Sequence, residues 1–356
     1  MNKPIILLIE FYFNSCLAIV GVLANSMTIV ILSRGNGDLS KGVSAYLISM
    51  ATADLLVVIF CIILRSLLHR LFPAMFWFYT TVCNTVVLLG YTAIDCSVWL
   101  TIAFTVDRFV AICCHNLKVK YCTTKTAAIV ITTVTALSVL RNIPFYFRSE
   151  PYGFYNGIPW GCAIKLEFFS LPGWVAFFWI HHLLNPLIPY FLILILNVTT
   201  VRHIVLASRA RRGLKRPNSG VQRSDPELAQ RRRSIILLFV VSGSFILLWL
   251  TKVSVFILME VSNRHAYPSY NHPVIIADQA GAMLFYLGTC TNTAVYALTQ
   301  KKFRDELKRI ATYPFSLIAK LCTERANSLT IAILSRGSSD LSKGVSAYLI
   351  SMTTAD

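Results

Sequence analysis

Several polar and charged residues of this chain lie inside or at the ends of long apolar stretches, where such side chains are costly. They are Asn25 and Asp54, the run Asp107-Arg108-Phe109, and Asn292 with Tyr296. An ionisable residue in a membrane-spanning segment is a functional candidate by default, because the cost of burying its charge must be offset. These residues are therefore the first candidates for a functional site.

No pattern typical of an enzyme or a transition-metal site accompanies them. The sequence has no Gly-rich phosphate loop, no His-Glu-x-x-His pair and no paired Cys-x-x-Cys motif. The histidines fall at different depths, with no nucleophile or carboxylate set beside them. We therefore expect no enzymatic activity and no cofactor.

The composition indicates a membrane protein with a basic excess. Of 356 residues, 56% are hydrophobic and only 14% are charged, whereas soluble proteins have about 25% charged residues. The mean hydropathy is +0.63, yet the net charge is +17. Nucleic-acid binding is the usual alternative for a basic chain, and it requires the basic residues to share one soluble face.

Seven segments are long and apolar enough to cross a bilayer, since a helix needs about 20 apolar residues to do so. They run approximately over Ile5–Leu32, Val43–Leu67, Thr80–Ile112, Ala127–Phe147, Trp174–Leu206, Ile235–Met259 and Val274–Thr299. None alternates with the two-residue period of a barrel strand. The expected fold is an all-α membrane protein, a seven-transmembrane helix bundle.

The basic residues orient this bundle. Of the 33 Lys and Arg residues, 25 lie in Ser33–Gly42, Asp107–Thr126, Arg202–Arg233 and the segment after Gln300. Short basic loops stay in the cytoplasm, so we expect a multi-pass plasma-membrane protein with its amino terminus outside and its carboxyl terminus inside. The basic loop Arg202–Arg233 can also contact anionic membrane lipids. The charge is an orientation signal, and no nucleic-acid partner is expected.

Two of the ten cysteines face the oxidising side in this topology. Cys83 lies at the outer end of the third span, and Cys162 lies in the outside loop Arg148–Gly173. The cytoplasmic cysteines should stay reduced. Two free thiols are the alternative, but an exposed outside pair is more often bonded. We therefore predict a disulfide between Cys83 and Cys162.

Seven motifs, in the right order and at the right depth, resemble those of the rhodopsin-like (class A) G-protein-coupled receptors. They are Gly21 with Asn25, Ala53-Asp54-Leu55, Trp77 before Cys83, Asp107-Arg108-Phe109, Pro189 breaking the fifth span, Phe245 with Trp249, and Asn292 with Tyr296. A basic amphipathic segment, Lys301–Arg309, follows as a short cytoplasmic helix with Phe303 on its apolar face. Within the family, the sequence looks closest to the orphan branch that responds to aromatic amino acids and peptides.

The resemblance covers about residues 5–310 and sets the domain limits. We interpret 1–310 as the seven-transmembrane receptor domain and 311–325 as a cytoplasmic tail. Residues 326–356 repeat 24–54 at 26 of 31 positions, and the copy is too short to cross a bilayer twice. We interpret it as a gene-model fusion artefact; a chimeric tail that docks on the membrane is the alternative.

The resemblance implies roles for two groups of residues. The activation switch consists of Asp107, Arg108, Trp249, Asn292 and Tyr296. The polar pocket consists of Asp54, Ser97, Asn292 and Asn25. In the family, the arginine pairs with its neighbouring acid at rest and reaches a heterotrimeric G protein when the sixth helix swings out. The resemblance also implies that the pocket holds Na⁺ and waters or that its carboxylate becomes protonated. The alternatives are an interfacial arginine that snorkels and a structural Asp54.

The sequence departs from the family at several positions. Thr251 and Thr293 replace the sixth- and seventh-helix prolines, so both helices should be straighter, although a threonine can bend a helix by bonding back to its backbone. Asn197 replaces the fifth-helix tyrosine, and Arg231 stands where some members place an acid that clasps Arg108. We expect a weak resting clasp and measurable basal signalling.

The ligand is expected to be an amino acid or a short peptide. Gly90 stands where amine receptors carry Asp, and Tyr286 stands where light receptors carry Lys. The outer half of the bundle has acids and bases on opposite walls, which suits a zwitterion. The candidates are Tyr91, Asp95, Arg141, His182, Lys252, Glu260, Asp278 and Tyr286. Arg141 or Lys252 would bind the carboxylate and an acid the amine; alternatively, these charges pair with one another.

Three functions remain open at this point. The leading one is a receptor that binds an extracellular ligand and activates a heterotrimeric G protein. A transporter or ion-conducting protein would need a continuous charged path, and the seven spans with Asp107-Arg108 argue against it. A signalling-silent receptor paralogue is the third, suggested by the missing prolines.

Overall fold

The computed structural model describes residues 4–35, 39–72, 75–214, 226–262, 271–310, 312 and 325. It has two compact units, Met1–Phe303 and Arg304–Asp356. In the second unit, residues 304–310 are helical, and Glu306 pairs with Arg309 one turn later at 3.3 Å. The predicted tail, apart from 312 and 325, and the repeat 326–356 lie outside the described residues.

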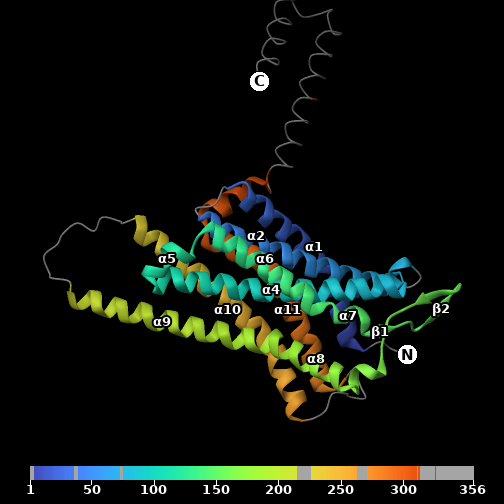
Figure 1. The fold of residues 1–356 in the computed structure, drawn as a ribbon. Coiled ribbons are helices and arrows are strands. Elements are labelled where there is room, and N and C mark those ends of the chain that lie inside the picture. The colour runs from blue at the N-terminus through green and yellow to red at the C-terminus, as the bar shows by residue number, and fades with distance from the viewer. Residues whose placement is uncertain are drawn as a thin grey trace, which may run out of the picture. The chain divides into compact units, whose positions relative to one another are not determined.

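Within the described residues, seven helical segments are long and apolar enough to cross a membrane (Figure 1). They are α1 (Ile5–Ser33); α2 (Lys41–Val57) with η1 (Val58–Leu68) and α3 (His69–Leu71); α4 (Thr80–Cys113); α6 (Thr124–Asn142) with α7 (Pro144–Phe147); α8 (Pro172–His182) with η4 (Leu183–Leu187) and α9 (Ile188–Leu214); α10 (Pro226–Val261); and α11 (Pro273–Thr299). We call them the first to seventh spans. The predicted seven-helix bundle is confirmed.

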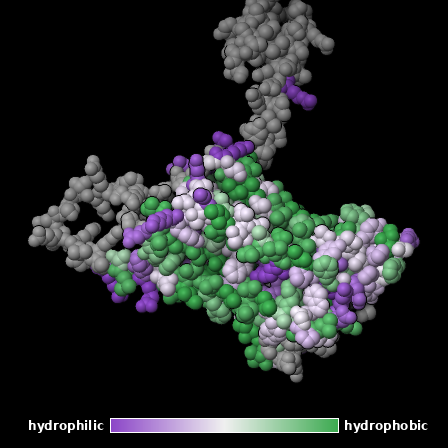
Figure 2. Space-filling model, in the orientation of Figure 1, coloured by the Kyte–Doolittle hydropathy of each residue, from purple (hydrophilic) through white to green (hydrophobic). Residues whose placement is uncertain are grey.

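The outward faces of these helices are apolar, as a lipid environment requires. Ile19, Leu137 and Leu247 expose 66%, 60% and 70% of their surface. Figure 2 shows a broad hydrophobic band over the helices, with hydrophilic residues gathered toward the two ends. Helices suit such a band because their backbone N–H and C=O groups bond to each other and need no water.

Small residues allow the helices to approach closely. A Cβ placed on Gly21 of α1 would lie 2.8 Å from both Cys290 Sγ of α11 and a methyl group of Val58. A Cβ on Gly90 of α4 would lie 2.9 Å from Cys61 Sγ of η1. Helices in lipid gain no hydrophobic driving force from meeting each other, so close van der Waals packing at small residues stabilises their contacts instead.

Two spans contain π-helical turns, in the second span at η1 and in the fifth at η4. The predicted break of the fifth span at Pro189 is wrong in its position. The non-helical residue is Asn185 (φ −157°, ψ 105°), and Pro189 lies in the first turn of α9. Pro189 has no backbone N–H to donate, but no hydrogen bond of a regular helical turn is lost, because Asn185, four positions earlier, is already non-helical.

The sixth and seventh spans have no interruption at the positions of the missing prolines. α10 is continuous through Thr251, and α11 is continuous through Thr293. After α11, residues 301–310 form the predicted short amphipathic helix. Phe303 is 1% exposed and its ring centroid lies 5.8 Å from that of Tyr296. The Phe303 side chain therefore packs on the end of the seventh span.

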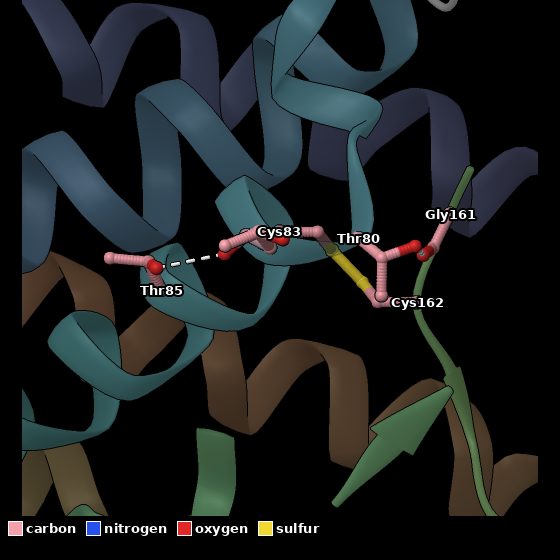
Figure 3. Close-up of a disulfide and its surroundings, with 6 residues drawn as sticks. Thr80, Cys83, Thr85, Gly161 and Cys162 are labelled. Atoms are coloured by element: carbon pink, nitrogen blue, oxygen red, sulfur yellow. Dashed lines mark hydrogen bonds between the residues drawn. A yellow bond between two sulfur atoms is a disulfide. The ribbon is translucent and has the colours of Figure 1, made fainter. Parts of the chain in front are cut away.

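One end of the bundle carries two short antiparallel strand pairs. β1 (Ser149–Glu150) pairs with β4 (Ala163–Ile164), and β2 (Gly153–Tyr155) pairs with β3 (Ile158–Trp160). Cys83 of α4 is bonded to Cys162, which follows β3 (Figure 3). Thr80 Oγ1 donates a hydrogen bond of 2.7 Å to the carbonyl of Gly161. The predicted disulfide is present and anchors the loop to the third span.

We expect Cys162→Ala to lower the free energy of unfolding by about 4 kcal/mol, because the disulfide closes a long loop between cysteines 79 residues apart. The measurement is thermal unfolding of the purified protein with and without reducing agent. Cys16→Ala is the control, since Cys16 is a free, exposed cysteine. Equal stability of the two variants would contradict this prediction.

Candidate functional site

The end of the bundle opposite the strands holds the predicted Asp107–Arg108 pair, near α5 (His115–Tyr121) (Figure 1). Arg108 Nε donates to Asp107 Oδ2 at 2.9 Å, and Nη2 contacts the same oxygen. The two side chains expose 12% and 5% of their surface. An ion pair that is mostly removed from water is retained only when each charge has its partner, so Asp107 holds Arg108 in this conformation.

The residue that supports Asp107 from the adjacent loop is Cys122. Burial raises the pKa of the Cys122 thiol to about 11, with a further contribution from the Asp107 charge. The thiol is therefore protonated at neutral pH, and its S–H donates to the Asp107 carbonyl at 3.5 Å. This contact links the loop after the third span to the Asp107–Arg108 pair.

Asp54 lies in a polar pocket in the middle of the bundle. It is 1% exposed, and its two oxygens accept hydrogen bonds from Ser97 Oγ (2.5 Å) and Asn292 Nδ2 (2.7 Å). A cavity of about 30 Å³ adjoins the carboxylate, and Trp249 forms part of its lining. The second, third and seventh spans therefore meet at one buried carboxylate.

Asn25, the fourth residue expected in this pocket, bonds elsewhere. Its Nδ2 donates to the carbonyls of Gly21 (3.0 Å) and Thr289 (2.9 Å). It therefore joins the first span to the backbone of the seventh, beside the carboxylate site and not within it.

Thr293, at the position of the missing seventh-helix proline, makes a second bond between these two spans. Its Oγ1 donates to the carbonyl of Ala24 at 2.9 Å and lies 2.7 Å from Thr28 Oγ1. A proline has no hydroxyl, so this link is specific to the threonine. We call Thr293, Thr28 and the Ala24 carbonyl the threonine latch.

The predicted switch residues Trp249 and Tyr296 are buried at 7% and 1% exposure. The indole stacks on Phe245 at 5.4 Å and meets Phe285 edge-on at 4.6 Å between ring centroids. These aromatic contacts join the sixth and seventh spans above the Asp54 cavity. Such rings interact favourably in offset and edge-on geometries.

In the outer half of the bundle, Asp95 is fully buried and held by three other residues. Its Oδ2 accepts from Arg141 Nε at 2.9 Å and from Asn142, and its Oδ1 accepts from Asn185 Nδ2 at 2.6 Å. Asp95 and Arg141 therefore bind each other, and Asn185 is the non-helical residue of η4. This cluster joins the third, fourth and fifth spans.

The other predicted ligand residues are partly engaged. Lys252 Nζ bonds to Asp278 Oδ1 at 2.5 Å between α10 and α11, with both side chains about one-third exposed. The ring of His182 stacks on Phe256 at 4.9 Å between centroids. The side chain of Glu260 lies outside the described residues. Tyr91 stacks on Phe145, and Tyr286 packs beside Phe285.

Sequence reasoning missed two arginines of this region. Arg65 of η1 and Arg148, before β1, both place their guanidinium groups beside the ring of Tyr91. A signal for Arg65 was available, because it follows Asp54 by 11 residues, or about three helical turns, and so falls near the same face.

Comparison with known proteins bears on these observations. Residues 24–296 match the family described as 7 transmembrane receptor (rhodopsin family). The chain belongs to this family. Zebrafish galanin receptor 2a is 24% identical over 306 residues, covering 83% of this chain and 76% of that receptor. Human C-C chemokine receptor type 1 is 23% identical, covering 93% and 88%, respectively.

A third relative is the rainbow trout (Oncorhynchus mykiss) C5a anaphylatoxin chemotactic receptor 1, 27% identical over 75% of this chain and 71% of that receptor. The protein is thus a ligand-binding G-protein-coupled receptor of the rhodopsin family, a receptor class that is not an enzyme. A transporter is not favoured. The membership indicates a multi-pass protein of the plasma membrane whose partners are a G protein and an extracellular ligand.

We expect Thr293→Val to lower the free energy of unfolding by about 1 kcal/mol, because the variant loses the interhelical bonds of the threonine latch. Thr291→Val is the matched control, since Thr291 Oγ1 bonds only within its own helix, to Gly288 O at 3.0 Å. Thermal unfolding of both variants measures the difference. An equal effect of the two substitutions would show that the latch does not stabilise the bundle.

Proposed function

We propose that this receptor binds an extracellular amino acid or short peptide and couples to its G protein through Arg108. The observation that carries the ligand class is the packing at Gly90. A Cβ at this position would lie 2.9 Å from Cys61 Sγ of η1, so the Cys61 side chain would have to shift before the aspartate of an amine receptor could stand there. Charged groups of both signs lie in the outer half of the bundle instead.

The relatives support a peptide ligand. They include receptors named for galanin, C-C chemokines and the C5a anaphylatoxin, and an FMRFamide receptor of Drosophila melanogaster. A melatonin receptor of zebrafish is also among them, at 24% identity. Peptide receptors thus recur among proteins that are similar to this chain over most of its length.

Aromatic recognition is the finer part of the proposal. The ring of Phe145 lies 4.1 Å from Tyr91, 5.0 Å from Phe177 and 4.8 Å from His181, between centroids. Such a cluster can accept another ring in stacked or edge-on geometry. This favours the branch of the family that responds to aromatic amino acids and peptides.

The proposed orientation places the amino terminus outside and the carboxyl terminus in the cytoplasm. The basic connectors support it, and so does the separation of the two ends. The Cys83–Cys162 disulfide lies at one end of α4, and Arg108 lies at the other. A disulfide on the oxidising side leaves Arg108 facing the G protein.

We also propose that the Asp54 pocket holds Na⁺. The cavity of about 30 Å³ exceeds the 10–15 Å³ that one water needs. Its lining offers the Asp54 carboxylate and the hydroxyls of Ser97, Thr101, Ser244 and Thr289, oxygen donors that suit a hard cation. Among the described residues, Asp54 bonds to Ser97 and Asn292 and to no basic side chain, so a cation would compensate its charge.

Arg108→Ala is expected to abolish G-protein activation, because the cation that contacts the inserting G protein is lost. Cells expressing wild-type receptor should show ligand-independent activation above untransfected cells, and the variant should show none at equal surface expression. A surface-expressed wild-type receptor with no basal activation would contradict the weak resting clasp and favour a signalling-silent paralogue.

Sodium should stabilise the wild-type receptor and not Asp54→Asn. At a Na⁺ concentration of ten times Kd, linkage predicts about 1.4 kcal/mol of added stability. Thermal unfolding in NaCl against choline chloride, at equal ionic strength, measures this. A sodium effect that persists in Asp54→Asn would place the cation elsewhere.

A further inference from the structure

Two arginines from separate elements converge on one tyrosine in the outer half of the bundle. The guanidinium carbon of Arg65 lies 5.9 Å from the centroid of the Tyr91 ring, and that of Arg148 lies 5.6 Å from the same centroid. Among the described residues, neither guanidinium forms an ion pair with a carboxylate. Two cations gathered without an acid are costly at the depth of a membrane.

Three acids of the outer half are engaged with other bases. Asp95 is bound by Arg141, and Asp278 is bound by Lys252. Glu10 of α1 is bound by Arg70, one residue after the start of α3, at 2.6 Å. None of these three acids is therefore paired with Arg65 or Arg148.

Arg148 is positioned by its surroundings. It is 7% exposed, and its guanidinium carbon also lies 5.3 Å from the ring centroid of Phe145 and 5.7 Å from that of Phe168. Aromatic faces attract a cation in this way. Its Nη1 donates to Tyr91 Oη at 3.5 Å, and its Nε is buried without a hydrogen-bond partner.

This contact leaves a donor on Tyr91. A phenolic oxygen that accepts from an arginine keeps its own proton for another acceptor. Arg65 differs from Arg148 because the residue is exposed, so part of its side chain can be reached from outside the bundle while its guanidinium lies beside the Tyr91 ring. It faces the bundle interior, since Tyr91 of the third span and Tyr286 of the seventh both lie near it.

We propose that Arg65 and the Tyr91 hydroxyl bind a carboxylate of the extracellular ligand, and that Arg148 is the residue that positions Tyr91. A guanidinium presents parallel N–H donors that match the two oxygens of a carboxylate. This inference rests on the proposed function and assigns its carboxylate contact. Arg141 and Lys252 are less suited to that task, because each already binds an aspartate of its own receptor.

The test uses benzoate as the probe and benzamide as its neutral counterpart, since the two differ mainly in charge. Thermal unfolding of the full-length receptor in lipid nanodiscs, titrated with each probe, gives an apparent Kd by linkage. Benzoate should stabilise the wild type, and benzamide should not. Arg65→Gln should weaken benzoate binding at least about tenfold, the size expected for losing a charge-assisted hydrogen bond.

Arg70→Gln is the matched control for Arg65→Gln. It removes an arginine five residues later on the same span, one that is already paired with Glu10, and it should keep the wild-type affinity for benzoate. Tyr91→Phe removes only the hydroxyl and should weaken binding by a smaller factor. The Tyr91→Phe variant therefore tests the hydroxyl without substituting Arg148, which is buried.

The proposal is overturned if benzoate and benzamide act alike, or if Arg65→Gln and Arg70→Gln bind benzoate equally. Arg108→Ala separates this outcome from failure of the receptor function, since it should lose G-protein activation and keep benzoate affinity. A wild type that binds benzoate through Arg65 and activates no G protein would refute the function and leave the carboxylate site standing.

Discussion

A bilayer offers no hydrogen-bond partners, so each polar side chain inside this bundle must find its partner within the protein, either on its own helix or on another. The contacts between spans follow from that constraint. Asp95 holds the third, fourth and fifth spans together, and Asp54 holds the second, third and seventh. Thr293 ties the first span to the seventh. The apolar surface determines that the chain enters the membrane, while these few polar contacts determine which helices meet.

The same constraint separates structural charges from functional ones. A buried ion pair such as Asp95 with Arg141 satisfies both members within the protein and leaves little for a ligand to gain. A charge retained without a counter-ion still has to be compensated, and the compensating group can come from outside. Arg108 has its acid next to it, whereas Arg65 shares an aromatic neighbour with a second cation. On physical grounds, that leaves Arg65 available to a partner.

The sequence alone predicted the spans, the Cys83–Cys162 disulfide and the Asp107–Arg108 pair, because each depends on local properties: run length, compartment and adjacency. That the outer acids and bases pair with one another was one of the two expectations, but which acid meets which base was not predictable. It depends on how each helix is rotated about its axis, and two spans change that rotation through π-helical turns. Asn185 is a non-helical partner of Asp95 because of such a turn.

The threonine at the seventh-helix proline position shows how a departure from the family can be compensated. A proline weakens a helix by removing a backbone donor, while Thr293 keeps the backbone intact and adds bonds to the first span. Each interhelical bond of this kind contributes about 0.6 kcal/mol, or roughly threefold in a conformational equilibrium. If the seventh span must leave the first on activation, the threonine latch favours the resting state by such a factor per bond. It would then counteract a weak clasp on Arg108, so the resting population is set by two small opposing terms.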